Sequence, residues 1–208
     1  MGTFIDGLKS KAKSDLKTIV LAEGEELRTI KAASIVKAEG YAKTILLGNA
    51  DKINAIANDE GIDIVGIEII DPSCGNEDFA ELFAELRKKK GVTLEQARET
   101  VKDPLYYGVM MVKTGQVDGM VAGAVNSSAN VIRPSLQILK TAPNTKIVSA
   151  FFIMNVPDCE YGENGTFVFG DSGLNQDPTA DELSEIAISS AASFKQLVGA
   201  EPKVAMLS

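Results

Sequence analysis

Short runs of β-branched and aliphatic residues alternate along this chain with longer segments whose apolar residues recur at helical spacing. The runs predict strands at 18–22, 44–47, 64–70, 117–122, 146–154 and 166–169. The longer segments predict helices at 25–39, 51–58, 77–90, from 94, 104–113, from Ser128 to about 140, and 180–198. Parallel strands need helical crossovers, so this alternation is typical of layered α/β folds. We therefore predict an α/β protein.

Residues at the helix ends support these bounds. Gly40 directly follows the first long helical segment, where a left-handed glycine commonly ends a helix. Thr93 with Gln96, and Thr179 with Glu182, have the spacing of a capping box, in which two polar side chains satisfy free amides reciprocally. The helices that begin near 94 and 180 are therefore predicted from local chemistry.

The chain of 208 residues contains no histidine. Histidine-ligated zinc, Ser-His-Asp triads and Cys-His pairs are therefore excluded within it. The two cysteines, Cys74 and Cys159, suit a reduced cytoplasmic protein better than a disulfide scaffold, and neither has neighbours that favour a thiolate nucleophile. Acid–base chemistry in this chain is left to Asp, Glu, Lys, Tyr and Cys.

Negative charge gathers in the last third of the chain. The formal net charge is −8, and only Lys195 and Lys203 are basic after Lys146. Most of these acids are typical of an ordinary solubilising surface, and an acidic chain does not favour nucleic-acid binding. No apolar run is long enough to span a membrane, and residues 1–13 are too charged for a signal peptide. We expect a soluble, cytoplasmic protein.

The last residues, 203–208, form an apolar run that is typical of the start of a buried strand. Natural domains rarely stop on such a strand, because its backbone needs a neighbour to pair with. We therefore expect the natural protein to continue past Ser208.

The segment 117–134 combines a strand, a loop of small residues and a helix. Gly123 and Ala124 would let a ligand approach the backbone, and Ser127 and Ser128 would place hydroxyls beside the amides of a helix start. Arg133 would add a bidentate cation for phosphate or carboxylate. The same residues are equally typical of a strand–turn–helix junction with serine caps. The pattern is neither a GxGxxG fingerprint nor a P-loop.

The segment 167–182 ends a predicted strand in Gly-Asp-Ser-Gly. Asp171, Ser172 and Asn175 are short polar residues that could orient a substrate, because open α/β sheets bind ligands at strand ends. They are also ordinary turn residues, and composition alone favours a turn.

Two further clusters have a structural interpretation. The basic run 86–91, LRKKKG, is typical of a solvated helix end stabilised by the helix dipole, and Arg87 could otherwise dock a phosphate. The apolar and aromatic residues of 104–113 recur at helical spacing, which favours core positions over a cofactor site. They are Tyr106, Tyr107, Met110 and Met111.

These segments together resemble the phosphate acetyl/butyryltransferase family. The resemblance covers the whole chain and is strongest in TIVLAEGEELRTIKAA, ELRKKKGVTLEQA, DPLYYGVMMVKTGQVDGMVAGAVNSSANVIRPSLQILKTAP, VSAFFIMNVP and GDSGLNQDPTADELSEIAISSA. It implies an α/β fold of two three-layer α/β/α domains about a cleft, like isocitrate and isopropylmalate dehydrogenases, usually as a homodimer. Residues 1–145 would form the first domain without its returning segment, and residues 146–208 the first part of the second.

The resemblance also implies a reaction, acetyl-CoA + phosphate ⇌ CoA + acetyl phosphate, by direct attack of the thiolate in a ternary complex. It assigns phosphate or acyl-phosphate binding to Ser127, Ser128, Arg133, Asp171 and Asn175. Arg87 would lie near the phosphates of CoA. Coenzyme A would be a substrate, with no cofactor or metal, and the catalytic base is expected beyond Ser208, so the 208 residues alone should have little activity.

Two alternatives remain open. A butyryltransferase of the same family would differ in the size of its acyl pocket. A non-catalytic domain that binds acetyl-CoA, as in the C-terminal part of large malic enzymes, would follow an upstream catalytic domain.

Overall fold

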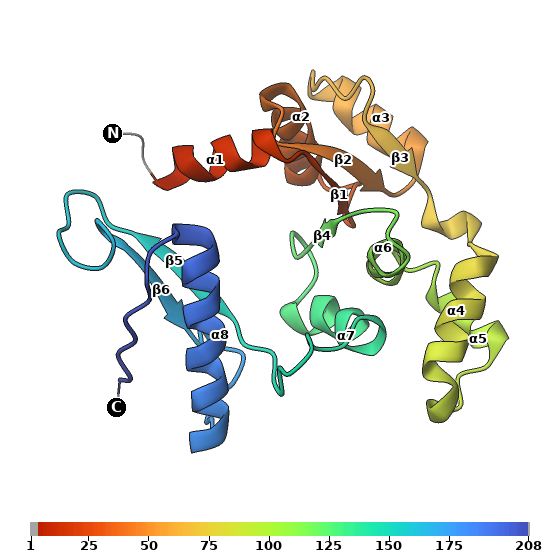
Figure 1. The fold of residues 1–208 in the computed structure, drawn as a ribbon. Helices are drawn as coiled ribbons and strands as arrows, with labels where there is room; N and C mark the ends of the chain where they lie inside the picture. The colour runs from red at the N-terminus through yellow and green to blue at the C-terminus, as the bar shows by residue number, and fades with distance from the viewer. Residues whose placement is uncertain (1–3, 208) are drawn as a thin grey trace. The chain divides into compact units, whose positions relative to one another are not determined.

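A computed structural model describes residues 4–207, which fall into two compact units (Figure 1). One unit covers Lys11–Lys140, and the other holds the residues from Thr141 onward together with the first described residues of the chain. The helix α1 (Phe4–Ser14) spans this division. The predicted domain boundary after residue 145 stays a prediction.

The unit over Lys11–Lys140 is built on one parallel sheet. Its strands are β1 (Lys17–Leu21), β2 (Ala42–Leu47), β3 (Glu68–Ile70) and β4 (Gly119–Val121). Its helices are α2 (Leu27–Glu39), α3 (Ala50–Asp59), α4 (Glu77–Arg87), α5 (Leu94–Thr100), α6 (Pro104–Lys113) and α7 (Ser128–Ile138), with short 3-10 turns at Pro72–Cys74 and Lys88–Lys90. Strands and helices alternate as predicted.

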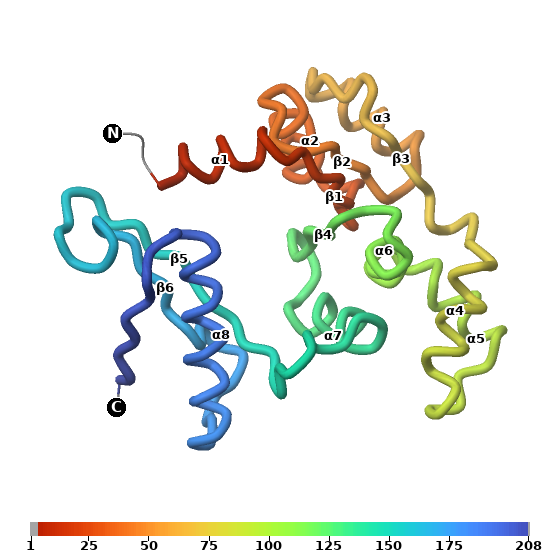
Figure 2. Tube along the Cα trace, viewed as in Figure 1, coloured from red at the N-terminus to blue at the C-terminus, as the bar shows by residue number. Residues whose placement is uncertain are grey.

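The sheet order is β3-β2-β1-β4, so β1 is paired on both sides. Val20 at its centre lies opposite Ile45 of β2 and Met120 of β4. After β3 the chain passes through α4, α5 and α6 before it returns to the sheet as β4 on the far side of β1 (Figure 2). The direction of strand addition therefore reverses at β1.

Helices cover both faces of this sheet. On one face Leu21 and Leu46 pack with Ile30 of α2 and Ile53 of α3. On the other face the strands pack against α4 to α7, where the fully buried Met110 belongs to the larger core. Adjacent strand residues point to opposite faces of the pleat, so a run such as Val20–Leu21 supplies both cores. This arrangement requires strands that are apolar on both faces.

The predicted helix ends are confirmed where local capping decides them. Gly40 has the left-handed conformation, with φ of 69°, and ends α2. Thr93 with Gln96 forms the predicted capping box of α5, and Thr179 with Glu182 forms that of α8 (Ala180–Val198). The helix predicted at 77–90 stops at Arg87, after which the backbone tightens into a 3-10 turn.

The strand predicted at 64–70 is wrong in its first half. Only Glu68–Ile70 pairs with β2. Ahead of it, the amide of Ile67 donates to the carbonyl of Ile64 at 3.0 Å, and Gly66 has φ of 79°. This tight turn uses backbone groups that a longer strand would need for pairing.

The second unit pairs strand β5 (Phe151–Asn155) with β6 (Thr166–Gly170) in an antiparallel hairpin. Ile153 lies opposite Val168 at its centre. The long helix α8 packs against β6 and buries Ile186 almost completely. A two-stranded sheet and one helix make up most of the regular structure of this unit.

Two predictions in this unit are wrong. The strand predicted at 146–154 begins at Phe151, because the backbone of Val148 and Ala150 bonds to the turn at 171–175 instead of to a strand. The run 203–207, predicted as a strand, is exposed and pairs with no strand of the described chain. Ser208 lies outside the described residues.

Candidate functional site

The carboxyl ends of β1 and β4 lie at the point where the strand order of the sheet reverses. In open α/β sheets, ligands bind outside the carboxyl ends of the strands at such a switch point, because the loops there diverge. The segment after β1 contains Glu23, and the loop after β4 contains Gly123 to Asn126. These two segments meet.

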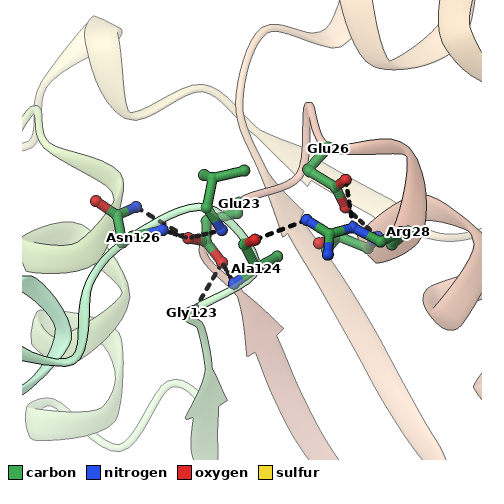
Figure 3. A network of polar contacts seen from close by, with 8 residues as sticks. Glu23, Glu26, Arg28, Gly123, Ala124 and Asn126 are labelled. Carbon is green, nitrogen blue, oxygen red and sulfur yellow. Dashed lines mark hydrogen bonds and ion pairs between the residues drawn. The ribbon is translucent and has the colours of Figure 1, made fainter.

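The carboxylate of Glu23 joins the segment after β1 to the loop after β4. It accepts hydrogen bonds from four successive backbone amides of that loop (Figure 3). Oε2 accepts from Gly123 at 2.8 Å and Ala124 at 2.6 Å. Oε1 accepts from Val125 at 3.0 Å and from Asn126 at 2.8 Å, and the Asn126 side-chain amide adds a bond of 2.9 Å. Successive amides that converge in this way form an anion-binding nest, which here holds a side chain of the protein itself.

Hydrogen bonding decides the ionisation of Glu23. Burial raises the pKa of this carboxyl, but the donors of Val125, Asn126 and Ala124 outweigh burial and lower the pKa from 4.5 to about 2. Each of these donors stabilises the charged form. Glu23 is therefore a carboxylate at neutral pH, and its negative charge is already matched by partners.

A guanidinium holds the same loop from its carbonyl side. Arg28 donates from Nη2 to the carbonyl of Ala124 at 2.6 Å, and its Nε donates to Glu26 at 2.7 Å (Figure 3). Glu26 also accepts from the amide of Thr29 and so caps α2. The loop after β4 is thus fixed through both its N–H groups and a carbonyl.

A hollow of about 420 Å³ opens beside this loop, at the ends of β1 and β2. Its charged lining residues are all acidic: Glu23, Glu25, Glu26 and Asp103. A phosphate would be repelled here, because like charges raise the free energy of binding. The hollow is therefore not the anion site that the sequence predicts.

The predicted anion site at 117–134 keeps only part of its donors. The amides of Gly123 and Ala124, expected to face a ligand, are occupied by Glu23. Ser127 caps α7 by accepting from the amide of Asn130 at 3.3 Å, which leaves its hydroxyl proton available. Ser128 begins the helix, and its amide has no acceptor among the described residues. The start of α7 thus retains free donors.

Two arginines far apart in sequence, Arg87 and Arg133, both act electrostatically on Tyr106. Burial raises the pKa of the Tyr106 hydroxyl, while the positive charges of Arg133 and Arg87 lower it. Arg133 comes from α7 and Arg87 from the end of α4, and neither makes an ion pair within the described residues. Two cations without acidic partners in one region favour an anionic ligand.

Arg87 also lines a groove of about 780 Å³. Its Nε is buried and has no hydrogen-bond partner in the described chain. Tyr106 lines the same groove and donates to Oε1 of Gln137 at 3.1 Å. A buried donor without a partner is costly, which is consistent with a missing ligand at this place.

Asp171 and Asn175 form a pair in the second unit. Asp171 accepts from the amides of Gly173 and Leu174, each at 2.8 Å, and from the Asn175 side chain at 2.6 Å. The five predicted phosphate ligands therefore form two groups, with Ser127, Ser128 and Arg133 in one unit and this pair in the other.

The sequence predicts no thiolate nucleophile, metal site or membrane span, and each of these expectations can be compared with the described residues. Cys74 is exposed and Cys159 is half-buried in a turn, and both are free thiols. Within residues 4–207, no three metal-ligating side chains of the Cys and carboxylate types gather. No described helix combines the length and apolarity needed to cross a membrane.

A family model described as phosphate acetyl/butaryl transferase matches residues 3–208. The chain belongs to this family. The phosphate acetyltransferase of Acetivibrio thermocellus is 60% identical over 208 residues, which are 99% of this chain and 62% of that protein. The phosphate acetyltransferase of Salmonella typhimurium is 46% identical, over 97% of this chain and 27% of that protein.

Solved structures agree with this family membership. A phosphotransacetylase from Streptococcus pyogenes superposes with a TM-score of 0.90 at 37% identity, over 100% of this chain and 63% of that one. The EutD phosphotransacetylase from Staphylococcus aureus gives 0.88 at 37% identity, over 99% and 60%. The mixed α/β fold is therefore that of phosphotransacetylase structures. This transferase-family chain spans about 62% of the length of the Acetivibrio relative.

Reasoning from the sequence missed two residues of this candidate site. Glu23 directly follows a predicted strand, which was the available signal, but its partners lie 100 and more residues away. Tyr106 packs against the core as predicted, but it is only half-buried and lines the groove beside Arg87, which the sequence did not indicate. Tyr107, Met110 and Met111 are buried as predicted.

Proposed function

We propose that the protein containing this chain transfers an acetyl group between coenzyme A and phosphate. The observation that carries the proposal is the buried Nε of Arg87, which has no hydrogen-bond partner in the described chain, in a chain of the phosphate acetyl/butaryl transferase family. Both substrates of this reaction are phosphorylated or are phosphate itself. Arginine binds such groups well, because its planar donors match phosphate oxygens.

Each cation then has a separate role. Arg133, with the hydroxyls of Ser127 and Ser128 and the free amide at the start of α7, would hold phosphate or the phosphoryl end of acetyl phosphate. Arg87 would bind a phosphate of CoA through its unpartnered Nε. Asn175, oriented by Asp171, would also bind phosphate or acetyl phosphate.

In the reaction, the CoA thiol loses its proton, its sulfur attacks the acetyl carbonyl, and phosphate leaves with the electrons of the C–O bond. A cationic phosphate site favours this step because it stabilises the leaving anion. Glu23 and Asp171 are poor bases, since hydrogen bonds lower the pKa of each carboxyl. We propose that the base comes from beyond Ser208 and that CoA, as a substrate, is the sole coenzyme.

We further propose a domain architecture, an oligomeric state and a cellular location for the protein. The helix-covered parallel sheet supports a two-domain fold like that of isocitrate dehydrogenase. A homodimer in the cytoplasm would complete this assignment, and size-exclusion chromatography with light scattering would measure the oligomeric state.

The test uses the product of the complete reading frame that carries this sequence. Purified protein is mixed with acetyl phosphate and CoA, and thioester formation is followed by absorbance. We expect rapid acetyl-CoA formation, with butyryl phosphate turned over more slowly. Equal or faster use of butyryl phosphate would favour the butyryltransferase, and tight acetyl-CoA binding without turnover would favour the regulatory domain. The 208-residue chain, assayed in parallel, should give little or no product.

A further inference from the structure

Glu23 accepts hydrogen bonds from four successive backbone amides and a fifth from the Asn126 side chain, an unusual density for a half-buried carboxylate. We infer that Glu23 is a positioning residue for the phosphate subsite, holding the loop 123–126 so that the start of α7 presents its donors to phosphate. This inference rests on the proposed function. Glu23 itself does not touch the substrate in this role.

The connection between Glu23 and the subsite is short. Asn126 is bound by Glu23 through both its backbone amide and its side-chain amide. The next residue, Ser127, caps α7, and Ser128 is the first residue of the helix. Because no flexible segment separates Asn126 from the cap, the position of the Glu23 carboxylate sets the position of the α7 start relative to β1.

Two side chains bind the loop 123–126, one through its amides and one through a carbonyl. Glu23 binds its N–H groups, and Arg28 binds the carbonyl of Ala124 (Figure 3). Glu23 follows β1 directly, and Arg28 lies in the first turn of α2, the next element of the chain. A loop held through both donor and acceptor groups loses the freedom to slide or rotate, as a preorganised ligand site requires.

The same carboxylate makes the subsite selective. Four amides in a nest would attract any anion, but the fixed charge of Glu23 fills it. The amide of Ser128, which Glu23 does not reach, stays free. Phosphate is thereby directed to the start of α7 and not to the loop before it.

The experiment compares three variants of the full-length protein. Glu23→Gln replaces one acceptor oxygen by a donor that faces the amides, and Glu23→Asp keeps the charge but shortens the side chain. We expect each to raise the KM for phosphate by about 10- to 100-fold, as expected for losing one or two hydrogen bonds, with the KM for CoA changed less than about twofold. Glu25→Gln is the matched control, because Glu25 instead bonds the amide of Asn49 and the ammonium of Lys52.

A rescue experiment separates positioning from general damage. Glu23→Ala leaves the nest empty, and formate is small enough to enter it and accept the same hydrogen bonds. We expect millimolar formate to lower the raised phosphate KM of Glu23→Ala while leaving the wild type and Glu25→Gln unchanged. Thermal unfolding of each variant reports whether it is folded.

Direct binding of phosphate distinguishes a failure of the proposed acetyl transfer from a failure of the positioning role of Glu23. Phosphate affinity is measured by titration calorimetry alongside turnover. If wild type binds phosphate but transfers no acetyl group, the proposed function fails, and weaker phosphate binding by the Glu23 variants alone still supports the inference. Equal losses for phosphate and CoA, no rescue by formate, or unchanged phosphate affinity in Glu23→Gln would each overturn it.

Discussion

Asn175 donates its side-chain amide to Asp171 at 2.6 Å and, from the same nitrogen, to the carbonyl of Val148 at 3.0 Å. Asp171 in turn accepts from the amide of Ala150 at 3.3 Å. The turn at 171–175 and the segment leading into β5 are therefore tied by side chains where the sequence predicts a longer strand. Burial raises the pKa of Asp171, and these donors outweigh burial and lower the pKa below its usual range.

Replacing Asp171 should loosen this turn. Asp171→Ala leaves the amides of Gly173 and Leu174 without their acceptor, so we expect both to exchange with solvent faster and the free energy of unfolding to fall by about 1–3 kcal/mol. Hydrogen exchange followed by NMR measures the two amides. Asp177→Ala is the control, because Asp177 is exposed and makes no hydrogen bond or ion pair within residues 4–207. Unchanged exchange at both amides would contradict the assignment.

The stabilising effect of Glu23 should depend on pH. Its pKa is about 2 in the folded chain against 4.5 for an unperturbed group, so the folded state favours the carboxylate. The resulting stability, at most about 3 kcal/mol, is present above pH 4.5 and is lost as the pH falls toward 2. Urea unfolding should therefore separate wild type from Glu23→Gln widely at about pH 6 and much less at about pH 3. A difference that does not change with pH would argue against this ionisation.

Gly24 is predicted to be intolerant of any side chain. A Cβ there would lie 2.6 Å from the carbonyl oxygen of Leu47 and 3.0 Å from its nitrogen, because the segment after β1 crosses the end of β2 closely. We expect Gly24→Ala to lower the free energy of unfolding by about 1–3 kcal/mol. Gly7→Ala is the matched control, since a Cβ at this position in α1 meets nothing within 4 Å and should raise stability by up to about 1 kcal/mol through helix propensity. Denaturant unfolding of the two variants compares them directly.

Removing Arg133 should impair the use of phosphate specifically. In the full-length protein we expect Arg133→Ala to raise the KM for phosphate about 10- to 100-fold, the effect of losing a charged hydrogen bond, and to alter the KM for CoA little. Lys113→Ala removes an equal charge from the exposed end of α6 and serves as the control. Steady-state kinetics with each substrate varied in turn gives both constants. A parallel rise in both would place Arg133 outside the phosphate subsite.

The fold was predictable wherever neighbouring residues decide it. Thr179 and Glu182 cap α8 within three positions, and Gly40 ends α2 through its own backbone conformation. Strand lengths were harder to predict, because a strand extends only as far as its partner. β3 is confined to three residues by the turn at Gly66, and the residues before β5 bond to Asp171 instead of a strand.

The candidate site was predictable only in part, for the same reason. Ser127 was found because a serine before a helix is a local signal, and it caps α7. The place of Glu23 after a predicted strand does not reveal its role, because its hydrogen-bond partners follow β4, about 100 residues later. Arg87 and Arg133 were singled out separately, and only the packing of α4, α6 and α7 shows that both act on Tyr106.

The central place of β1 also determines the order in which the chain can assemble. During synthesis β1 leaves the ribosome long before β4, and Asn126 follows Glu23 by 103 residues. At about 5–20 residues per second, this delay is roughly 5–20 s, and the cost of closing so long a loop falls on the last step. Until then Glu23 is a solvated acid beside an open sheet edge. Within the unit over Lys11–Lys140, the nascent chain therefore completes the β1–β4 edge of the sheet only after the β1–β3 half has had time to form.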